Sequence, residues 1–193
     1  MAGDTFFITG DREADDLLAA DPLALLLGML LDQQVPMEWA FGAPARLRER
    51  LAGSLDAGAI AAMDPDDLAA AFREKPALHR YPTSMAKRAH ELCRHLVEHH
   101  DGRAEAVWEG VADGAELRRR LEALPGFGKD KARIFLAVLA KRRGVRPPGW
   151  EDAAGPFADG QPRSVADVTD QTSLERVRAF KKEQKAAGRA KDE

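Results

Sequence analysis

The chain has 193 residues, 45% of them hydrophobic and 32% charged, and its formal net charge is −3 at pH 7. A chain of this length buries roughly 70% of its unfolded surface, so one domain, or one domain with a tail, can fold without a covalent staple. The single cysteine, Cys93, excludes a disulfide framework, a cysteine-held zinc site and a four-cysteine iron–sulfur cluster.

The sequence carries no export or membrane signal that we recognise. Its longest apolar run, residues 23–31, is too short to span a bilayer, and the acidic N-terminus has no apolar signal core. An unpaired cysteine suits a reducing compartment, so we expect a cytoplasmic protein. Five histidines crowd together without an H-E-x-x-H pattern, and we expect solvated positions rather than a metal site at His79, His90, His95, His99 and His100.

An Ala-, Leu- and Arg-rich sequence with few β-branched runs predicts an all-α fold. The first helix signal, Asp21-Pro22, places an N-cap before a first-turn proline, and the apolar helix behind it should be central and buried. Further caps are expected at Asp64, at Thr83 or Ser84, at Asp113 and at Ser173. The predicted helices span residues 23–33, 36–51, 65–74, 84–100, 104–110, 114–123, 129–143, 151–154 and 173–187, with a Gly/Pro-rich loop at 155–164.

Residues 124–132 read L-P-G-F-G-x-x-x-A, which predicts a helix end, a tight turn and a new helix. Pro125 cannot continue the first helix, and glycines on both sides of Phe127 can take φ > 0 and approach a ligand closely. The free N–H groups of the second helix favour an anion. The stretch resembles the hairpin of the helix-hairpin-helix motif, which grips nucleic-acid backbone without reading sequence. The alternative is an ordinary helix C-cap with two glycines.

Charge is distributed unevenly along the chain. Residues 118–146 hold ten basic and two acidic residues, a local charge of +8, whereas residues 1–32 hold seven acids and one arginine, a local charge of −6. A basic segment centred on the predicted hairpin is what a nucleic-acid binder of modest net charge needs. Residues 171–193 are also basic, and could be either a solvated packing helix or an accessory DNA contact.

Three segments together resemble the helix-hairpin-helix-GPD superfamily of base-excision DNA glycosylases: residues 30–37, L-L-D-Q-Q-V-P-M; residues 85–89, M-A-K-R-A; and the hairpin itself. The resemblance implies two helical lobes with a cleft between them. It covers residues 20–157, and we place the glycosylase-like domain at 1–160 and a C-terminal loop and basic helix with a frayed end at 161–193. By position, Gln34 matches the side chain that fills the gap left by a flipped base. The implied DNA contacts are Gln34, Leu124, Gly126, Phe127, Gly128, Lys129 and Lys131.

The resemblance also implies a catalytic aspartate after the second hairpin helix. The expected window, residues 148–150, contains no acid. A loop two residues longer would place Asp152 there, with Glu151 as second choice, and the third possibility is that neither acts. Lyase-competent relatives carry a lysine where this chain has Asp130. Because a one-residue offset turns a helical side chain by about 100°, Lys129 and Lys131 should not substitute for it.

We therefore expect a monofunctional glycosylase that uses water to cleave the bond between a damaged base and its sugar in double-stranded DNA, acting as a monomer. A flipped base could stack on Trp39, Tyr81 or Trp150, although each aromatic is more often part of a core. We expect no resident cofactor: relatives that resemble endonuclease III carry an iron–sulfur cluster held by four cysteines, and the single cysteine here excludes that branch. A monovalent cation at the hairpin carbonyls is left open. The alternative function is a non-catalytic helix-hairpin-helix DNA-binding module.

Overall fold

The structure, a computed structural model, describes residues 6–189, and every regular element in that range is helical, as the sequence predicts. None of these helices combines the length and apolarity needed to cross a bilayer. In chain order the elements are α1 Arg12–Ala20, α2 Pro22–Leu31, α3 Met37–Arg50, α4 Ala57–Ala62, α5 Pro65–Arg73, α6 Pro82–His100, η1 Glu105–Val107, α7 Gly114–Glu122, α8 Lys129–Arg142, α9 Trp150–Ala154, η2 Gly155–Ala158, η3 Val165–Asp167 and α10 Gln171–Arg189.

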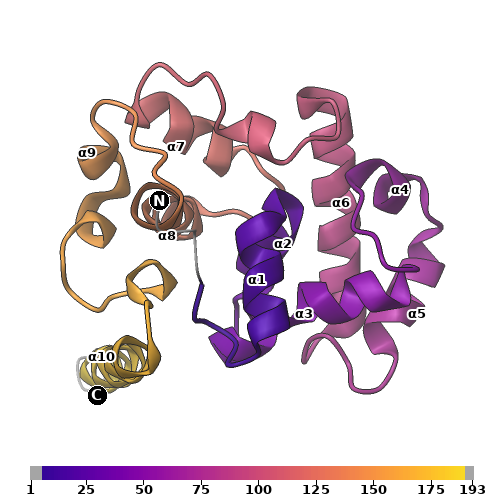
Figure 1. Ribbon diagram of the computed structural model, residues 1–193, viewed down its shortest axis with the longest axis horizontal. Helices are drawn as coiled ribbons and strands as arrows, with labels where there is room; N and C mark the ends of the chain where they lie inside the picture. The colour runs from indigo at the N-terminus through magenta and orange to yellow at the C-terminus, as the bar shows by residue number, and fades with distance from the viewer. Residues whose placement is uncertain (1–5, 190–193) are drawn as a thin grey trace.

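The helices form two lobes, and α2 lies between α6 of the first lobe and α8 of the second (Figure 1). In the first lobe, residues 12–100, α3 packs on α1 and α2, while α4 and α5 pack on α6. In the second lobe, residues 105–189, α8 packs against α7, α9 and η3. One continuous apolar core runs through both lobes.

Helix α2 lies in the middle of that core because its sequence is apolar on every side. Residues 23–31 are all buried. As predicted, Asp21 caps the helix: its Oδ1 accepts from the backbone N–H groups of Leu23 at 2.8 Å and Ala24 at 3.2 Å. Gly28 lets α3 come close, since a Cβ there would lie 2.6 Å from Cδ1 of Phe41. The last turn of α2 therefore has a fixed position between the lobes.

Several boundaries differ from the sequence prediction. Helices α1 and α4 were not expected; both are short, and helices of that length depend on tertiary packing more than on their own sequence. Helix α6 starts at Pro82 with Tyr81 as N-cap, ahead of the predicted Thr83 or Ser84. The cap of α10 is Asp170, whose Oδ1 accepts from the Ser173 N–H at 2.7 Å, so Ser173 is the cap's partner rather than the cap.

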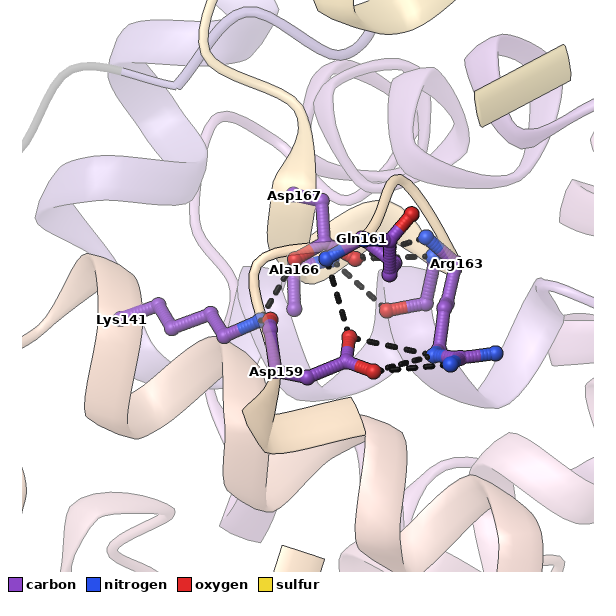
Figure 2. A network of polar contacts seen from close by, with 7 residues as sticks. Lys141, Asp159, Gln161, Arg163, Ala166 and Asp167 are labelled. Carbon is purple, nitrogen blue, oxygen red and sulfur yellow. Dashed lines mark hydrogen bonds and ion pairs between the residues drawn. The ribbon is translucent and has the colours of Figure 1, made fainter. Parts of the chain in front are cut away.

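A polar network holds the segment before α10 against α8 (Figure 2). Lys141 of α8 donates to Oδ1 of Asp167 at 2.6 Å and to the carbonyl of Asp159 at 2.7 Å. The other oxygen of Asp167 accepts from the backbone N–H groups of Arg163 and Ser164, both at 3.0 Å. This network fixes where α10 begins, at the lower left of Figure 1.

Candidate nucleic-acid interface

The hairpin turn, residues 123–128, joins α7 to α8. The N–H of Phe127 donates to the carbonyl of Leu124 at 3.0 Å, which closes the turn. The Phe127 side chain is 6% exposed and packs edge-on against Phe135, with ring centroids 5.9 Å apart. The Phe127 side chain therefore anchors the turn from inside the protein. Because the side chains of Leu124 and Phe127 are both buried, only their backbone could contact DNA.

The two glycines of the hairpin turn do different work. Gly126 has φ +82°, and a Cβ there would lie 2.4 Å from Cδ1 of Leu30. Gly128 has φ −87°, a value open to any residue, and a Cβ there would meet nothing within 4 Å. The expectation of φ > 0 on both sides of Phe127 therefore holds only for Gly126. Gly128 is the N-cap of α8 and supplies no capping side chain, which leaves the first N–H groups of that helix free for an anion.

The hairpin also grips the last turn of α2 through Lys131. Its Nζ donates to the carbonyl of Leu30 at 2.8 Å and lies 6.0 Å from the centroid of the Phe127 ring. The pKa of Lys131 is lowered to about 8, chiefly by burial; the charge of Asp32 acts in the opposite direction, and that of Arg88 adds to the lowering. Lys129, in contrast, is exposed at the start of α8. Of the two lysines expected to hold phosphate, Lys129 is the one directed to solvent.

The Gln turn, residues 32–36, follows α2 directly and places Gln34 in the left-handed region, at φ +57°, with its side chain exposed. His79 holds this turn from beneath. Its Nε2 lies 3.2 Å from the carbonyl oxygen of Leu31 and 3.0 Å from that of Gln33, while its Nδ1 accepts from the N–H of Tyr81 at 3.0 Å. These partners require a neutral ring protonated on Nε2. His79 is 1% exposed, and burial lowers its pKa. The prediction of a solvated His79 was wrong.

Asp32 is a functional candidate that the sequence analysis missed. It is the C-cap residue of α2, half-buried, and its carboxyl makes no hydrogen bond or ion pair with any residue the structure describes. Burial raises the pKa of Asp32, while the charges of Lys181 and Lys131 lower it and that of Glu38 raises it. The usable signal was an acid at the end of a wholly apolar helix, where the negative end of the helix dipole disfavours it.

Helix α10 lies beside the Gln turn. Arg178 forms a hydrogen-bonded ion pair with Glu38, in the first turn of α3, and the charge of Lys181 is felt at Asp32. Leu174 and Val177 are buried beneath the helix, whereas the side chains of Arg176, Lys181, Lys182 and Lys185 are exposed. Of the two alternatives for the C-terminal segment, the structure shows packing along one face of α10, while Lys181 on the same helix acts on Asp32 of the Gln turn. We call the hairpin turn and the Gln turn together the paired turns.

The predicted catalytic acids lie elsewhere. Glu151 and Asp152 are exposed in the first turn of α9. Asp152 lines a cavity of about 360 Å³ with Asp113 and Arg118, at the N-terminus of α7. The hairpin turn is at the other end of α7, whose nine residues span about 13 Å. The structure therefore separates Asp152 from the paired turns by the length of a helix.

The aromatic candidates divide in the same way. The rings of Trp39 and Tyr81 flank His79, with centroids 6.5 and 6.2 Å from the imidazole. Trp39 lines a cavity of about 630 Å³ between α3 and residues 75–77. Trp150, in contrast, begins α9 close against Gly114, where a Cβ would lie 2.7 Å from its Cα. Trp39 and Tyr81 are therefore near the Gln turn, and Trp150 is not.

The described residues thus form a two-lobed helical fold in which the hairpin turn lies beside an exposed glutamine turn, and free N–H groups at the start of α8 suit contacts with a nucleic-acid backbone. The model of the HhH-GPD superfamily of base excision DNA repair proteins matches residues 27–192, and the chain belongs to that family. Searches of curated proteins and of solved structures find no significant match. Membership makes the chain a DNA repair protein of the glycosylase superfamily.

Proposed function

We propose that the protein is a monofunctional DNA glycosylase, which rotates a damaged base out of duplex DNA and hydrolyses its bond to the sugar. The observation that carries the proposal is the contact of the hairpin with Leu30, four residues before Gln34. Gly126 packs on the Leu30 side chain, and Lys131 binds the Leu30 carbonyl. The hairpin turn with the first N–H groups of α8, which we call the phosphate clamp, thus lies beside Gln34, whose side chain can enter the base stack.

The geometry suits the energetics of base flipping. Turning a base out of the helix costs a few kcal/mol, which the protein must recover from contacts with the distorted DNA. Free N–H groups at the start of α8 can hold the backbone phosphate, and the exposed Gln34 can replace lost stacking and hydrogen bonds. Because His79 holds the carbonyl of Gln33, the Gln turn is ordered before DNA binds, and little entropy is lost on binding.

Water is the nucleophile in this proposal. Asp130, at the position where lyases carry a lysine, is exposed and cannot attack as an amine. As the base leaves, positive charge develops on the sugar, and a nearby carboxylate can stabilise that charge and orient the water. Asp152, followed by Glu151, is the candidate that the family pattern suggests, and no cofactor enters the reaction.

The test is a panel of duplex oligonucleotides, each with one damaged base. We expect base release from at least one lesion, an intact abasic strand that breaks only on adding alkali, and no covalent adduct on adding borohydride. A borohydride-trapped adduct would show an amine nucleophile and would contradict the monofunctional mechanism.

The second candidate function is a DNA-binding module without catalysis. The distance of Asp152 from the paired turns favours it, because the acid that the family pattern suggests does not face the clamp. Salt-sensitive duplex binding with no base release from any lesion would establish this alternative.

A further inference from the structure

We propose that Asp32 is the carboxylate that acts on the sugar and the attacking water, and that Lys131 is the positioning residue beside it. This inference rests on the proposed glycosylase activity and assigns its acid. It differs from the family pattern, which places the acid after the second hairpin helix.

Asp32 lies in the chain between the residue that the hairpin contacts and the exposed glutamine. The hairpin turn contacts Leu30, and the exposed Gln34 is four residues further on. An extended chain advances at most about 3.6 Å per residue, so the Cα of Asp32 lies within about 7 Å of both Cα positions. A phosphate held at the hairpin and a gap filled by Gln34 would thus bracket the nucleotide next to Asp32.

The carboxyl of Asp32, unlike those of Asp15 and Asp21, has no hydrogen-bond partner among the described residues. Asp15, which is buried, accepts from the N–H groups of Ile8 and Thr9 at 3.1 and 3.0 Å, and Asp21 caps α2. Within residues 6–189, the Asp32 carboxyl has no such partner, and neither of its oxygens is sealed from solvent. A half-buried carboxyl at the unfavourable end of a helix costs stability, and a ligand or reaction intermediate would offset that cost.

Charged side chains from three elements act on Asp32. Lys131 faces it from the hairpin, Lys181 from α10 and Glu38 from α3, while Arg88 of α6 acts on Lys131. Burial raises the pKa of Asp32, which makes the carboxylate a better proton acceptor, and the charges of the two lysines favour its ionised form. The cations also offset repulsion between the carboxylate and DNA phosphates.

The reaction balances with water alone. The oxygen of water bonds to C1′ of the sugar, and the bond from C1′ to the base nitrogen breaks, with its electron pair leaving on the base. Asp32 takes one proton from the water, and the departing base gains a proton from solvent. Asp32 then returns its proton to solvent, leaving an abasic site and a free base.

The test compares Asp32→Asn with wild type on a lesion that wild type processes, by single-turnover base release and by affinity for the same duplex. We expect Asp32→Asn to lower the rate by about 100-fold or more and to leave affinity equal or higher. The matched control is Asp67→Asn, which removes an exposed acid from the first turn of α5 and should keep the wild-type rate. Melting curves will confirm that each variant is folded.

Lys131→Gln tests the positioning role through the pH profile of base release. Removing a cation that lowers the pKa of Asp32 should move the acidic limb of the profile to higher pH, an effect that simple loss of packing would not produce. A rate loss with an unmoved acidic limb would refute the role of Lys131.

Two results would overturn the assignment of Asp32: a wild-type rate of base release in folded Asp32→Asn, or loss of base release in Asp152→Asn but not in Asp32→Asn. Either result would leave the proposed glycosylase activity standing. If wild type releases no base from any lesion, the proposed function fails and the assignment fails with it.

Discussion

His79 shows how one buried side chain can govern the Gln turn. Its Nε2 is committed to the carbonyls of Leu31 and Gln33 and its Nδ1 to the N–H of Tyr81, so the neutral form is built into the fold. A second proton on Nδ1 would break the bond from the Tyr81 N–H. Burial is the main reason why the pKa of His79 is lowered; the carbonyls of Gln33 and Leu31 act in the opposite direction, and the charges of Lys131 and Arg88 lower it as well.

The lowered pKa predicts that the folded protein loses stability in mild acid. Above the unfolded pKa of about 6.5, the ring is neutral in both states and its contribution is complete. As pH falls below that value, the unfolded chain takes up the proton more readily than the folded one. We expect His79→Gln, which retains a donor and an acceptor, to lose less melting temperature than wild type between pH 7.5 and 5.5. Equal losses would contradict this role of His79.

The lowered pKa of Lys131 predicts how the stability of the folded protein changes at alkaline pH. Its pKa is about 8 in the folded protein, against about 10.4 in an unfolded chain. Below pH 8 both states hold the proton, and the folded state bears the cost of a buried charge. As pH rises from 8 to 10.4, the folded state sheds that proton first, so stability should increase relative to Lys131→Met. Urea midpoints of both proteins at pH 7.5 and 9.5 measure the difference, and an unchanged difference would contradict the lowered pKa.

Local signals explain which elements could be predicted from the sequence. The helix order, the buried α2 and the hairpin follow from apolar periodicity, caps and glycine placement, all of which operate over a few residues. Asp32 and His79 were missed as site residues because distant segments of the chain build their surroundings. Lys131, for example, acts on Asp32 and binds the carbonyl of Leu30, which is 101 positions away in the sequence. A register argument within one helix could not show that the Lys131 side chain turns toward α2.

The hairpin turn gives a prediction at the scale of one element. Gly128→Ala adds a methyl group into open space at an ordinary φ, so stability should stay within about 0.5 kcal/mol of wild type. The methyl group should nevertheless hold a phosphate away from the α8 N–H groups and weaken duplex binding by about tenfold, or about 1.4 kcal/mol. Wild-type affinity in Gly128→Ala would remove the clamp assignment.

Gly126→Ala is the contrasting variant. Its positive φ and the approach to Leu30 mean that the fold itself must adjust, and we expect a loss of about 2 kcal/mol or more in the free energy of unfolding. Binding by this variant therefore reports the fold as well as the clamp. Chemical denaturation of the two variants side by side separates these effects.

At the scale of the whole molecule, exposed basic side chains lie both at the hairpin, where Lys129 begins α8, and on α10, despite a net charge of −3. We expect duplex affinity to fall steeply with salt, by about 0.9 log units per log unit of salt for each phosphate contacted. Neutralising the exposed Arg176, Lys182 and Lys185 with glutamine should reduce that slope. The matched control neutralises three exposed cations on α1, α3 and α6, Arg12, Arg48 and Arg94. Equal slopes in both triple variants would show that α10 does not contact DNA.

The support of the hairpin by Leu30 has a mechanical consequence. Leu30 of α2 contacts both Gly126 and Lys131, so the hairpin turn is held at a fixed distance from the Gln turn that follows α2. The two turns that would contact DNA therefore have a fixed separation before a duplex binds. The DNA must then do the bending, and its local stiffness becomes part of how substrates are chosen. A base pair already loosened by mismatch yields more cheaply than a sound one. We therefore expect the same lesion to be released faster opposite a mismatched partner than opposite its proper one.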